Sequence, residues 1–477
     1  MNTSSLSIFV LSLFAFARAQ QIGKLIPEVQ PKLNYQTCTK AGGCTKHNGT
    51  VTLDSKWRPV HAVNSTKKCL SDGGVWDPEL CPDGLTCAKN CALEGVDYCD
   101  FGVTSDGDSL NLKLGIENTK RHISPRVYLL DDKGKYVSMK LKNQEFTFDV
   151  DLSTLPCGTN GALYLSEMEG DGGTSKFPTN KAGSIYGTGY CDAQCPQDVT
   201  YLGGKVNLEG WKSGPDGTGQ GKLGSCCTEM DIWEGNSEVN ALTPHACRGK
   251  GPQICDGDAC GPICDKGGCD FGPFRYGDHD FFGPKKTVDT TQKFTVVTQF
   301  LTDNQKSTGQ LTEIRRKYIQ NGKVIQNSKT KVPSMKSFDS LSPEFCNASK
   351  TALEGGHNDF QAKGGFTAMG ESLERGMVLA MSIWDDHSDT KMLWLDGSFP
   401  TDSDPKMPGV LRGPCTPENS NATFIEKTYP NATVTFSNIR FGDLDTTCQS
   451  ASNSSSISNT TPPPITKRST ISHSRLY

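Results

Sequence analysis

The sequence predicts an all-β protein, folded as a sandwich or barrel of strands. Short runs that alternate apolar and polar residues are frequent, and Gly, Asn, Asp and Pro turns separate them. Stretches with helical periodicity are short and few. The composition agrees, because 477 residues with 35% apolar content and 50 glycines are typical of a soluble, loop-rich globular protein.

Three kinds of segment carry the strand prediction. Residues 146–152 alternate apolar and polar side chains, which predicts one half-buried strand, and 434–438 repeat the pattern. The run GMVLAMSIW at 376–384 is apolar throughout, which predicts a strand covered on both faces. Residues 318–325 predict a β-hairpin, because Asn321-Gly322 supplies the two positive φ angles of a type I′ turn.

The two ends of the chain differ in composition from the rest. Residues 1–19 contain an apolar run that ends at Ala17-Arg18-Ala19, which is typical of a secretory signal peptide and its cleavage site. No Lys or Arg precedes the run, so a buried N-terminal helix is the alternative. Residues 449–477 are rich in Ser, Thr and Pro and predict a disordered tail. One folded domain, 20–448, is therefore expected between them, and no further module rich in cysteine and aromatic residues follows it.

Charge and hydropathy exclude several classes of partner. The net charge is −4, and loss of residues 1–19 with Arg18 makes it slightly more negative. An acidic surface disfavours nucleic acids and anionic membranes as partners and suits a neutral substrate. No apolar run is long enough to span a bilayer.

The 20 cysteines predict a disulfide framework in an exported protein. A zinc site at Cys255, Cys260, Cys264 and Cys269 is the alternative, but these spacings are not those of a zinc knuckle. Seven Asn-x-Ser/Thr sequons also favour export. They lie at Asn48, Asn64, Asn347, Asn421, Asn431, Asn453 and Asn459.

The segment 224–235, GSCCTEMDIWEG, is the strongest candidate for chemistry. Glu229 and Asp231 are two residues apart and share one face of a strand. Glu234 reaches that face only if a β-bulge lies between Asp231 and Glu234. The apolar Met230, Ile232 and Trp233 predict that the strand lies in the middle of a sheet.

Acidic side chains on one face repel each other when ionised, so at least one pKa must rise. Glycoside cleavage needs one protonated and one ionised carboxyl group. Five extended residues span ~16 Å, whereas a retaining pair of carboxyl groups lies about 5–5.5 Å apart. The alternative is a strand with an acidic, solvated face.

The sequence resembles glycoside hydrolase family seven, the fungal cellobiohydrolases and endoglucanases. The segment CCTEMDIWEGNSEVNALTPHAC at 226–247 is similar to the signature of that family. The resemblance extends through nearly the whole domain, and it includes the segments 80–91, 155–168, 186–196, 377–386 and 434–443.

The resemblance implies a concanavalin-like β-jelly-roll sandwich with long loops around a substrate cleft or tunnel. It implies retaining hydrolysis of a β-1,4-glucan such as cellulose. By motif position Glu229 is the nucleophile, Glu234 the general acid/base and Asp231 the partner of the nucleophile. His245 is expected beside the acid/base, with a structural turn histidine as the alternative.

The resemblance also implies residues that bind sugar. Aromatic platforms suit the apolar faces of glucose, and amides suit its hydroxyl rim. The expected platforms are Trp57, Trp384 and Trp394, and the expected polar cleft residues are Asn160, Tyr164 and Gln194. Asp270, Arg275 and Arg412 match the charges of the family's product site.

The motifs give mixed indications of whether the enzyme cleaves at chain ends, as a cellobiohydrolase does, or within chains, as an endoglucanase does. Segments 207–225 and 397–414 are long, as in the tunnel enzymes, whereas 261–268 is short and Pro59 replaces a tryptophan common at the tunnel entrance. Segments 26–29 and 124–136 are more similar to endoglucanases. We expect a cellobiohydrolase with a partly open tunnel, and an endoglucanase is the alternative.

Several expectations complete the prediction. The mechanism requires no metal or cofactor, the protein is expected to be a secreted monomer, and the chain shows no cellulose-binding module. A glucan-binding jelly roll that has lost catalysis is the alternative from another class.

The cysteine pattern departs from the family at one position. Ala92 stands where the family commonly has a cysteine, which leaves Cys99 and Cys448 without an expected partner. A disulfide between these two is a hypothesis.

Overall fold

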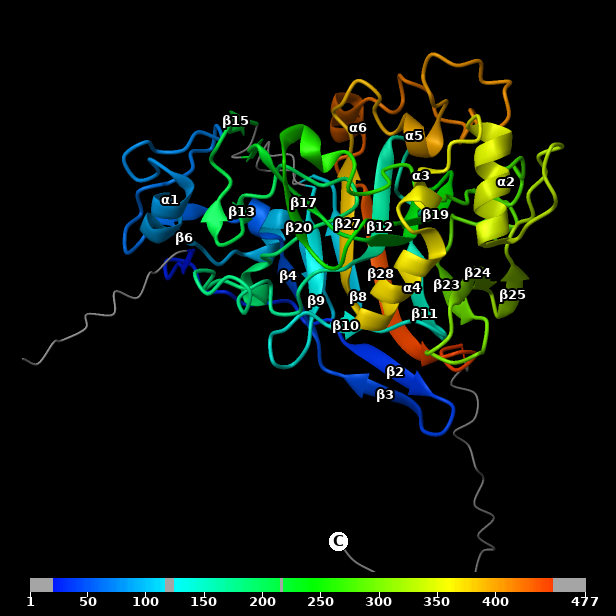
Figure 1. Cartoon of the computed structure of the whole chain (residues 1–477), viewed down its shortest axis with the longest axis horizontal. Helices are drawn as coiled ribbons and strands as arrows, with labels where there is room; N and C mark the ends of the chain where they lie inside the picture. Colours follow the sequence, from blue (N-terminus) through cyan, green and yellow to red (C-terminus); the bar gives the residue numbers. More distant parts are fainter. Residues whose placement is uncertain (1–19, 116–123, 215–217, 449–477) are drawn as a thin grey trace, which may run out of the picture.

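The computed structural model describes residues 20–115, 124–214 and 218–448, and its core is a sandwich of two β-sheets (Figure 1). The predicted signal peptide and tail lie outside the described residues. Among the described residues, no helix is both long enough and apolar enough to cross a membrane. The all-β prediction is confirmed.

The first sheet has seven strands in the described part of the chain. In order across the sheet they are β19 (Asn240–His245), β18 (Glu229–Gly235), β12 (Thr159–Ser166), β27 (Met377–Asp385), β9 (Arg126–Leu130) and β4 (Thr50–Leu53), with β10 (Ser138–Met139) paired to β27. Strand β27 contains the all-apolar run, and both its faces are covered. Leu379 and Met381 pack in the core between the sheets, and Val378 and Ala380 pack on the other face in a second cluster with Tyr128.

The second sheet has ten described strands. Its main path is β25 (Lys323–Gln326), β24 (Leu311–Gln320), β23 (Phe294–Thr302), β11 (Gln144–Asp151), β28 (Thr433–Asp443), β2 (Tyr35–Thr39) and β3 (Gly43–His47). Three short strands extend it: β26 (Ser340–Leu341), β8 (Ser109–Lys113) and β7 (Val103–Ser105). The predicted hairpin is confirmed as β24–β25, and its turn residues Asn321 and Gly322 have φ angles of 51° and 72°.

The remaining elements are short. They are the sheet β1 (Gln21–Ile22), β6 (Cys91–Leu93) and β5 (Val60–Ala62), and the strand pairs β13 (Tyr201–Leu202) with β14 (Lys205–Val206), β15 (Lys212–Ser213) with β16 (Gly219–Gln220), β17 (Leu223–Cys226) with β20 (Gln253–Asp256) and β21 (Phe282–Gly283) with β22 (Val288–Asp289). The helices are α1 (Gly84–Asn90), α2 (Pro343–Leu353), α3 (Asp359–Ala362), α4 (Gly365–Arg375), α5 (Leu393–Asp396) and α6 (Ala422–Thr428).

The main core lies between the two sheets. Phe148 of β11 and Phe436 of β28 pack from one side, and Leu163 of β12 and Trp233 of β18 pack from the other, all fully buried. Phe148 meets Trp233 edge-on, with ring centroids 6.2 Å apart. Aromatic burial of this extent anchors β18, so its other face is free to present polar side chains.

Strand β11 is covered more completely than its alternating pattern predicts. Glu145 and Thr147 of its outer face are 0% exposed. The chain after β28 folds over them, and Glu145 accepts hydrogen bonds from the backbone amides of Thr446 and Thr447 at 3.0 and 2.8 Å. The half-buried prediction is therefore wrong for this strand, because a carboxylate supplied with backbone donors can be buried.

Nine disulfides connect the described chain, which confirms the predicted framework. Their pairs are Cys38–Cys44, Cys69–Cys91, Cys81–Cys87, Cys157–Cys415, Cys191–Cys227, Cys195–Cys226, Cys247–Cys264, Cys255–Cys260 and Cys269–Cys346. The alternative zinc site fails, because all four of its sulfur atoms are bonded in these pairs.

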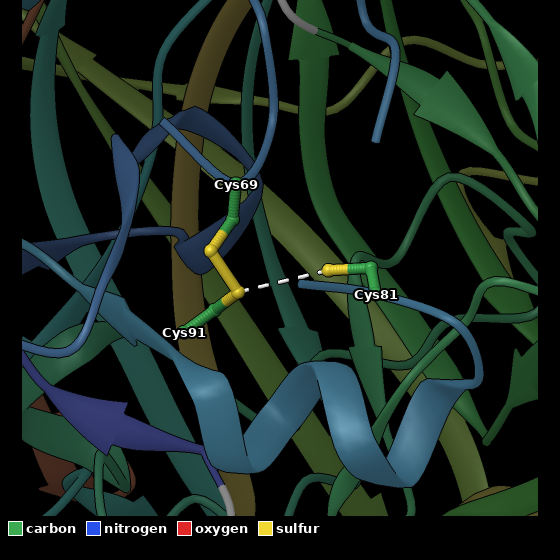
Figure 2. A group of neighbouring side chains, drawn as sticks. All are labelled: Cys69, Cys81 and Cys91. Atoms are coloured by element: carbon green, nitrogen blue, oxygen red, sulfur yellow. Dashed lines mark hydrogen bonds between the residues drawn. A yellow bond between two sulfur atoms is a disulfide. The ribbon is translucent and has the colours of Figure 1, made fainter. Parts of the chain in front are cut away.

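Figure 2 shows one of these bonds, Cys69–Cys91, with the side chain of Cys81 next to it. Cys69 and Cys91 form one disulfide, and the Sγ atom of Cys81 lies 3.6 Å from that of Cys91. Cys81 is itself bonded to Cys87 of α1. The four sulfurs therefore form a compact, fully buried centre for the small lobe around α1.

The hypothesis of a Cys99–Cys448 disulfide is wrong, because both thiols are free. Cys99 lies in a short turn beside Asp97 and is exposed. Cys448 follows β28 and lies against the Thr447 hydroxyl on the ten-stranded sheet.

A strand pairing and a buried ion pair hold the N-terminal segment against the rest of the fold. Strand β1 pairs with β6 through Gln21 and Ala92. Arg58 donates two hydrogen bonds to the Glu28 carboxylate, at 2.7 and 2.9 Å, and the side chains are 0% and 7% exposed. The Tyr98 hydroxyl donates a third, at 2.6 Å.

Glu28→Gln is expected to lower the free energy of unfolding by about 3 kcal/mol, because it leaves the buried Arg58 guanidinium without its counter-charge. Guanidinium chloride unfolding measures this change. The matched control is Glu371→Gln, which removes a half-exposed carboxylate that pairs with Arg375 along α4, and it should cost less than about 0.5 kcal/mol. Equal losses for the two variants would contradict the role of the Glu28–Arg58 pair.

Candidate active site

A cavity of about 1400 Å³ lies on the face of the seven-stranded sheet that is turned away from the core. Strands β12, β18, β19 and β27 supply part of its wall, and long loops supply the rest. Every predicted site residue except Asn160 lines it. The lining includes Trp57, Tyr164, Gln194, Glu229, Asp231, Glu234, His245, Asp270, Arg275, Trp384, Trp394 and Arg412.

The predicted β-bulge in β18 is confirmed by the pairing on both sides. Toward β12, Ser166 pairs with Glu229 and Ala162 with Glu234. Toward β19, His245 pairs with Glu229 and Ala241 with Glu234. Five residues on each neighbour thus face six on β18, so β18 has one extra residue between Asp231 and Glu234.

The extra residue determines which way Glu234 points. Residues four apart on a regular strand share a face, so partners Ala162 and Ser166 face the same side. Glu229 and Glu234, which pair with them, therefore also face the same side. Met230, Ile232 and Trp233 are 0% exposed in the core, which leaves the cavity side to the acids.

Glu229 is only 7% exposed and accepts a hydrogen bond from the backbone amide of Ala193 at 3.0 Å. Burial raises its pKa well above the usual value, and the charges of Asp231 and Asp192 add to the increase. The amide of Ala193 opposes the shift, because it stabilises the ionised carboxylate.

Glu234 accepts a hydrogen bond from the Asn160 side-chain amide at 3.0 Å. Burial first, and then the charge of Asp231, raise its pKa to about 8, while His245 works in the opposite direction. Since the pKa values of Glu229 and Glu234 are both raised and these groups repel each other, the free protein holds a proton on this pair at neutral pH.

His245 forms an ion pair with Asp231, at 3.1 Å between Nε2 and Oδ2. Burial lowers the pKa of His245, but the hydrogen bond and charge of Asp231 outweigh burial and raise it to about 9. A protonated ring donates from both nitrogens, and Nδ1 lies 3.0 Å from the Asp265 carbonyl oxygen. Asp231 and His245 thus form a fixed pair beside the two glutamates.

One group of potential metal ligands lies in this site. Ligand atoms of Glu229, Asp231 and His245 lie within 4.8 Å of one another. They already hydrogen-bond to protein groups, as described above, so hydrogen bonding accounts for the cluster. The short distances also place the expected nucleophile, Glu229, directly beside its expected partner, Asp231.

Aromatic side chains border the cavity, as expected for a sugar site. Trp384 and Trp394 stack with ring centroids 6.1 Å apart and an angle of 26° between their planes. Trp57 lies beside Lys56, whose Nζ is 5.0 Å from the centre of the indole ring. These partly exposed faces are suited to the apolar faces of pyranose rings.

Helix α5, which carries Trp394, is fixed to the sheet through Asp396. This buried carboxyl group accepts hydrogen bonds from the Gly158 amide at 2.7 Å and the Asn236 amide at 2.8 Å. Burial raises the pKa of Asp396 to about 7. Asn236 lies two residues after Glu234, so the same network supports a platform and the strand of the acids.

The expected product-site charges form one network. Arg275 donates hydrogen bonds to Asp270, to Glu354 at 2.8 Å and to the Gly409 carbonyl at 3.2 Å. Burial would raise the pKa of Asp270, but Arg275 and Arg412 lower it to about 2. Burial, with Arg275 nearby, lowers the pKa of Arg412 to about 10. The network is charged and prearranged to hydrogen-bond a polar ligand.

Asn160 is not a cavity residue. It lies on β12 but is 0% exposed. Its amide donates to Glu234, and its Oδ1 accepts from the Gly235 amide at 3.0 Å. The expectation of sugar binding is corrected for this residue, because its position supports Glu234 instead.

Sequence reasoning missed several polar residues of the cavity. Arg126 lies 3.4 Å above the ring centre of Tyr190 and donates to Asp54 at 2.6 Å. Tyr190 donates to Asp192 at 2.6 Å. Asp192 lies two residues before the predicted Gln194, within the segment 186–196 that carries the family resemblance, whereas Arg126 carried no local signal.

Comparison with known proteins agrees with this geometry. The model of glycosyl hydrolase family 7 matches residues 22–448. A cellobiohydrolase from Daphnia pulex is 42% identical, with 89% of this chain and 99% of that chain covered and a TM-score of 0.86. A Melanocarpus albomyces cellobiohydrolase complexed with cellotetraose is 38% identical, with 89% and 99% covered and a TM-score of 0.82.

An endocellulase, EGI from Humicola insolens, is also similar. It is 39% identical, with 90% of this chain and 100% of that chain covered and a TM-score of 0.77. The jelly-roll sandwich expected from the sequence is thereby confirmed. The family match over almost the whole described chain, together with these identities, shows that the protein belongs to glycosyl hydrolase family 7 and is a glycoside hydrolase.

Proposed function

We propose that the protein is a secreted retaining cellulase, and that Glu229 and Glu234 cleave the β-1,4 bond of a glucan chain lying in the cavity. The observation that carries this proposal is the bulge in β18, which brings both glutamates to one face. The tryptophans that line the same cavity support a sugar polymer as substrate. The similar cellobiohydrolases and endocellulase are consistent with this substrate class.

The proposed reaction has two steps. Glu229 attacks the anomeric carbon while Glu234 donates its proton to the departing glycosidic oxygen, which gives a glycosyl-enzyme. Glu234, now ionised, removes a proton from water, and the resulting attack releases the sugar with its β configuration. Asp231 and His245, which form an ion pair beside Glu229, keep the Glu229 carboxylate in position during both steps.

The activity should decline as pH rises through about 8, because Glu234 acts as an acid only while protonated and its pKa is raised to about 8. Above that pH, kcat/KM for cello-oligosaccharides should fall about tenfold per pH unit. An aryl cellobioside whose leaving group needs no proton is the control, and its kcat/KM should fall less steeply. Parallel profiles for the two substrates would contradict Glu234 as the group responsible.

We propose cellobiohydrolase action, because both long loops border the cavity. Thr218 and Gln220 of 207–225 line it, and Trp211 of this loop donates from Nε1 to the Gly74 carbonyl at 2.7 Å. Gly409 and Val410 of 397–414 line it as well. Higher TM-scores with the two cellobiohydrolases than with the endocellulase also favour this choice.

An endoglucanase of the same family is the second candidate, because 261–268 is short and the identities to both classes are close. Digestion of amorphous cellulose distinguishes them. A cellobiohydrolase releases mainly cellobiose while the viscosity of soluble cellulose derivatives hardly changes. Rapid loss of viscosity, with new reducing ends in the insoluble fraction, would show endo action instead.

A further inference from the structure

We propose that Asn431 carries an N-linked glycan, and that the first N-acetylglucosamine of this glycan packs on an exposed aromatic platform formed by Tyr429 and Phe424. This modification requires passage through a secretory pathway, and it is independent of the cleavage reaction. Three features support this proposal: the turn that contains Asn431, the two exposed rings beside that turn, and the absence of an exposed ring at the same spacing before the other described sequons.

Asn431 lies in an exposed β-turn between α6 and β28. The Ala432 amide donates to the Tyr429 carbonyl at 2.9 Å, which closes the turn over Pro430 and Asn431. Pro430 is at the second turn position, where its fixed φ is favoured. The sequon Asn431-Ala432-Thr433 therefore begins in a tight, preformed turn, in which Tyr429 precedes the asparagine by two residues.

The two aromatic rings lie open at the surface beside this turn. Tyr429 is 41% exposed and Phe424, on α6, is 44% exposed. Their ring centroids are 6.3 Å apart and the planes are at 77°, so the rings form one angled surface. The faces of a pyranose ring carry C–H groups, which pack on aromatic faces and remove apolar surface from water.

The other described sequons do not have this arrangement. The residues two positions before Asn48, Asn64 and Asn421 are Lys46, Ala62 and Asn419. Asn347 has an aromatic residue there, Phe345, but that ring is 0% exposed in the core. Among the sequons within the described residues, Asn431 alone follows an exposed ring at this spacing, so a glycan there gains a contact that the others lack.

The first experiment measures occupancy. The full chain is secreted from a eukaryotic host and digested with trypsin, which cuts after Lys427 and Arg440 and yields a peptide with Asn431 as its only sequon. Glycopeptide mass spectrometry, with and without enzymatic glycan release in heavy-oxygen water, should show most of this peptide glycosylated. Recovery of the secreted peptide mainly unmodified would overturn the proposal.

The second experiment tests the contact. Asn431→Gln should lower the melting temperature by about 2 °C when Tyr429 and Phe424 are present, and should change it little in a Tyr429→Ala/Phe424→Ala background. Asn48→Gln is the matched control, and its effect should be the same in both backgrounds. An equal effect of Asn431→Gln in both backgrounds would show that the glycan does not use the platform.

A third experiment trims the glycan on the wild-type protein. Its result does not depend on any folding defect that the Tyr429→Ala/Phe424→Ala substitutions cause. A glycosidase that leaves one N-acetylglucosamine on each asparagine should preserve the melting temperature, and complete removal should lower it by at least as much as Asn431→Gln does. If trimming to a single sugar already causes the full loss, the first sugar does not make the proposed contact.

Discussion

Glu229→Gln is expected to reduce kcat on cello-oligosaccharides by at least about 10⁴-fold while leaving their binding nearly intact. The amide is close in size to the carboxylate, but it cannot form the glycosyl-enzyme. The substrate contacts that we propose lie mainly with the tryptophans and the charged network, so KM or Kd should change by less than about tenfold. Steady-state hydrolysis and calorimetric titration with cellotetraose measure the two quantities.

Glu79→Gln is the matched control for this variant, because Glu79 is 85% exposed near α1 and lies outside the cavity lining. Its kinetics should equal those of the wild type. Hydrolysis by Glu229→Gln at a wild-type rate would mean that another group is the nucleophile. Loss of hydrolysis together with loss of binding would point to a collapsed site instead.

Glu234→Ala is expected to have an effect that depends on the leaving group. Cellulose and cello-oligosaccharides need a proton on the departing oxygen, so their kcat/KM should fall by roughly 10³-fold. A dinitrophenyl cellobioside needs no such proton, so it should still form the glycosyl-enzyme and release a burst of dinitrophenol. Water attack then becomes slow, because the base is missing.

Azide should rescue the second step in this variant, since it is a nucleophile that needs no base and fits the space left by the side chain. The expected product is the β-cellobiosyl azide, identified by NMR. A matched azide experiment on Glu229→Gln should give no β-azide. A uniform loss for all leaving groups, without azide rescue, would contradict Glu234 as the acid/base.

The sequence predicted the form of β18 well, because this strand combines a simple alternation with one interruption. Glu234 could share the face of Glu229 and Asp231 only if a β-bulge lay between Asp231 and Glu234. A strand that must bury Trp233 and still present Glu234 to the other face needs one extra residue. The pairing with β12 and β19 confirms that interruption.

Other features depend on contacts between distant segments, which no local pattern records. Asn160 was expected to touch sugar, but β12 places it beneath Glu234, where an amide is needed for support. Arg126 binds Asp54, which lies 72 residues away in the sequence. Cys99 and Cys448 were matched by elimination, and elimination fails when two thiols remain free.

The most direct test of the account is the anomeric configuration of the first product. Proton NMR, recorded within seconds of adding enzyme to cellotetraose or a soluble glucan, resolves the α and β anomers before mutarotation mixes them. If Glu229 and Glu234 act by the proposed double displacement, the β anomer of the new reducing end appears first and the α anomer grows later. Initial release of the α anomer would show direct attack by water and would contradict a covalent intermediate on Glu229.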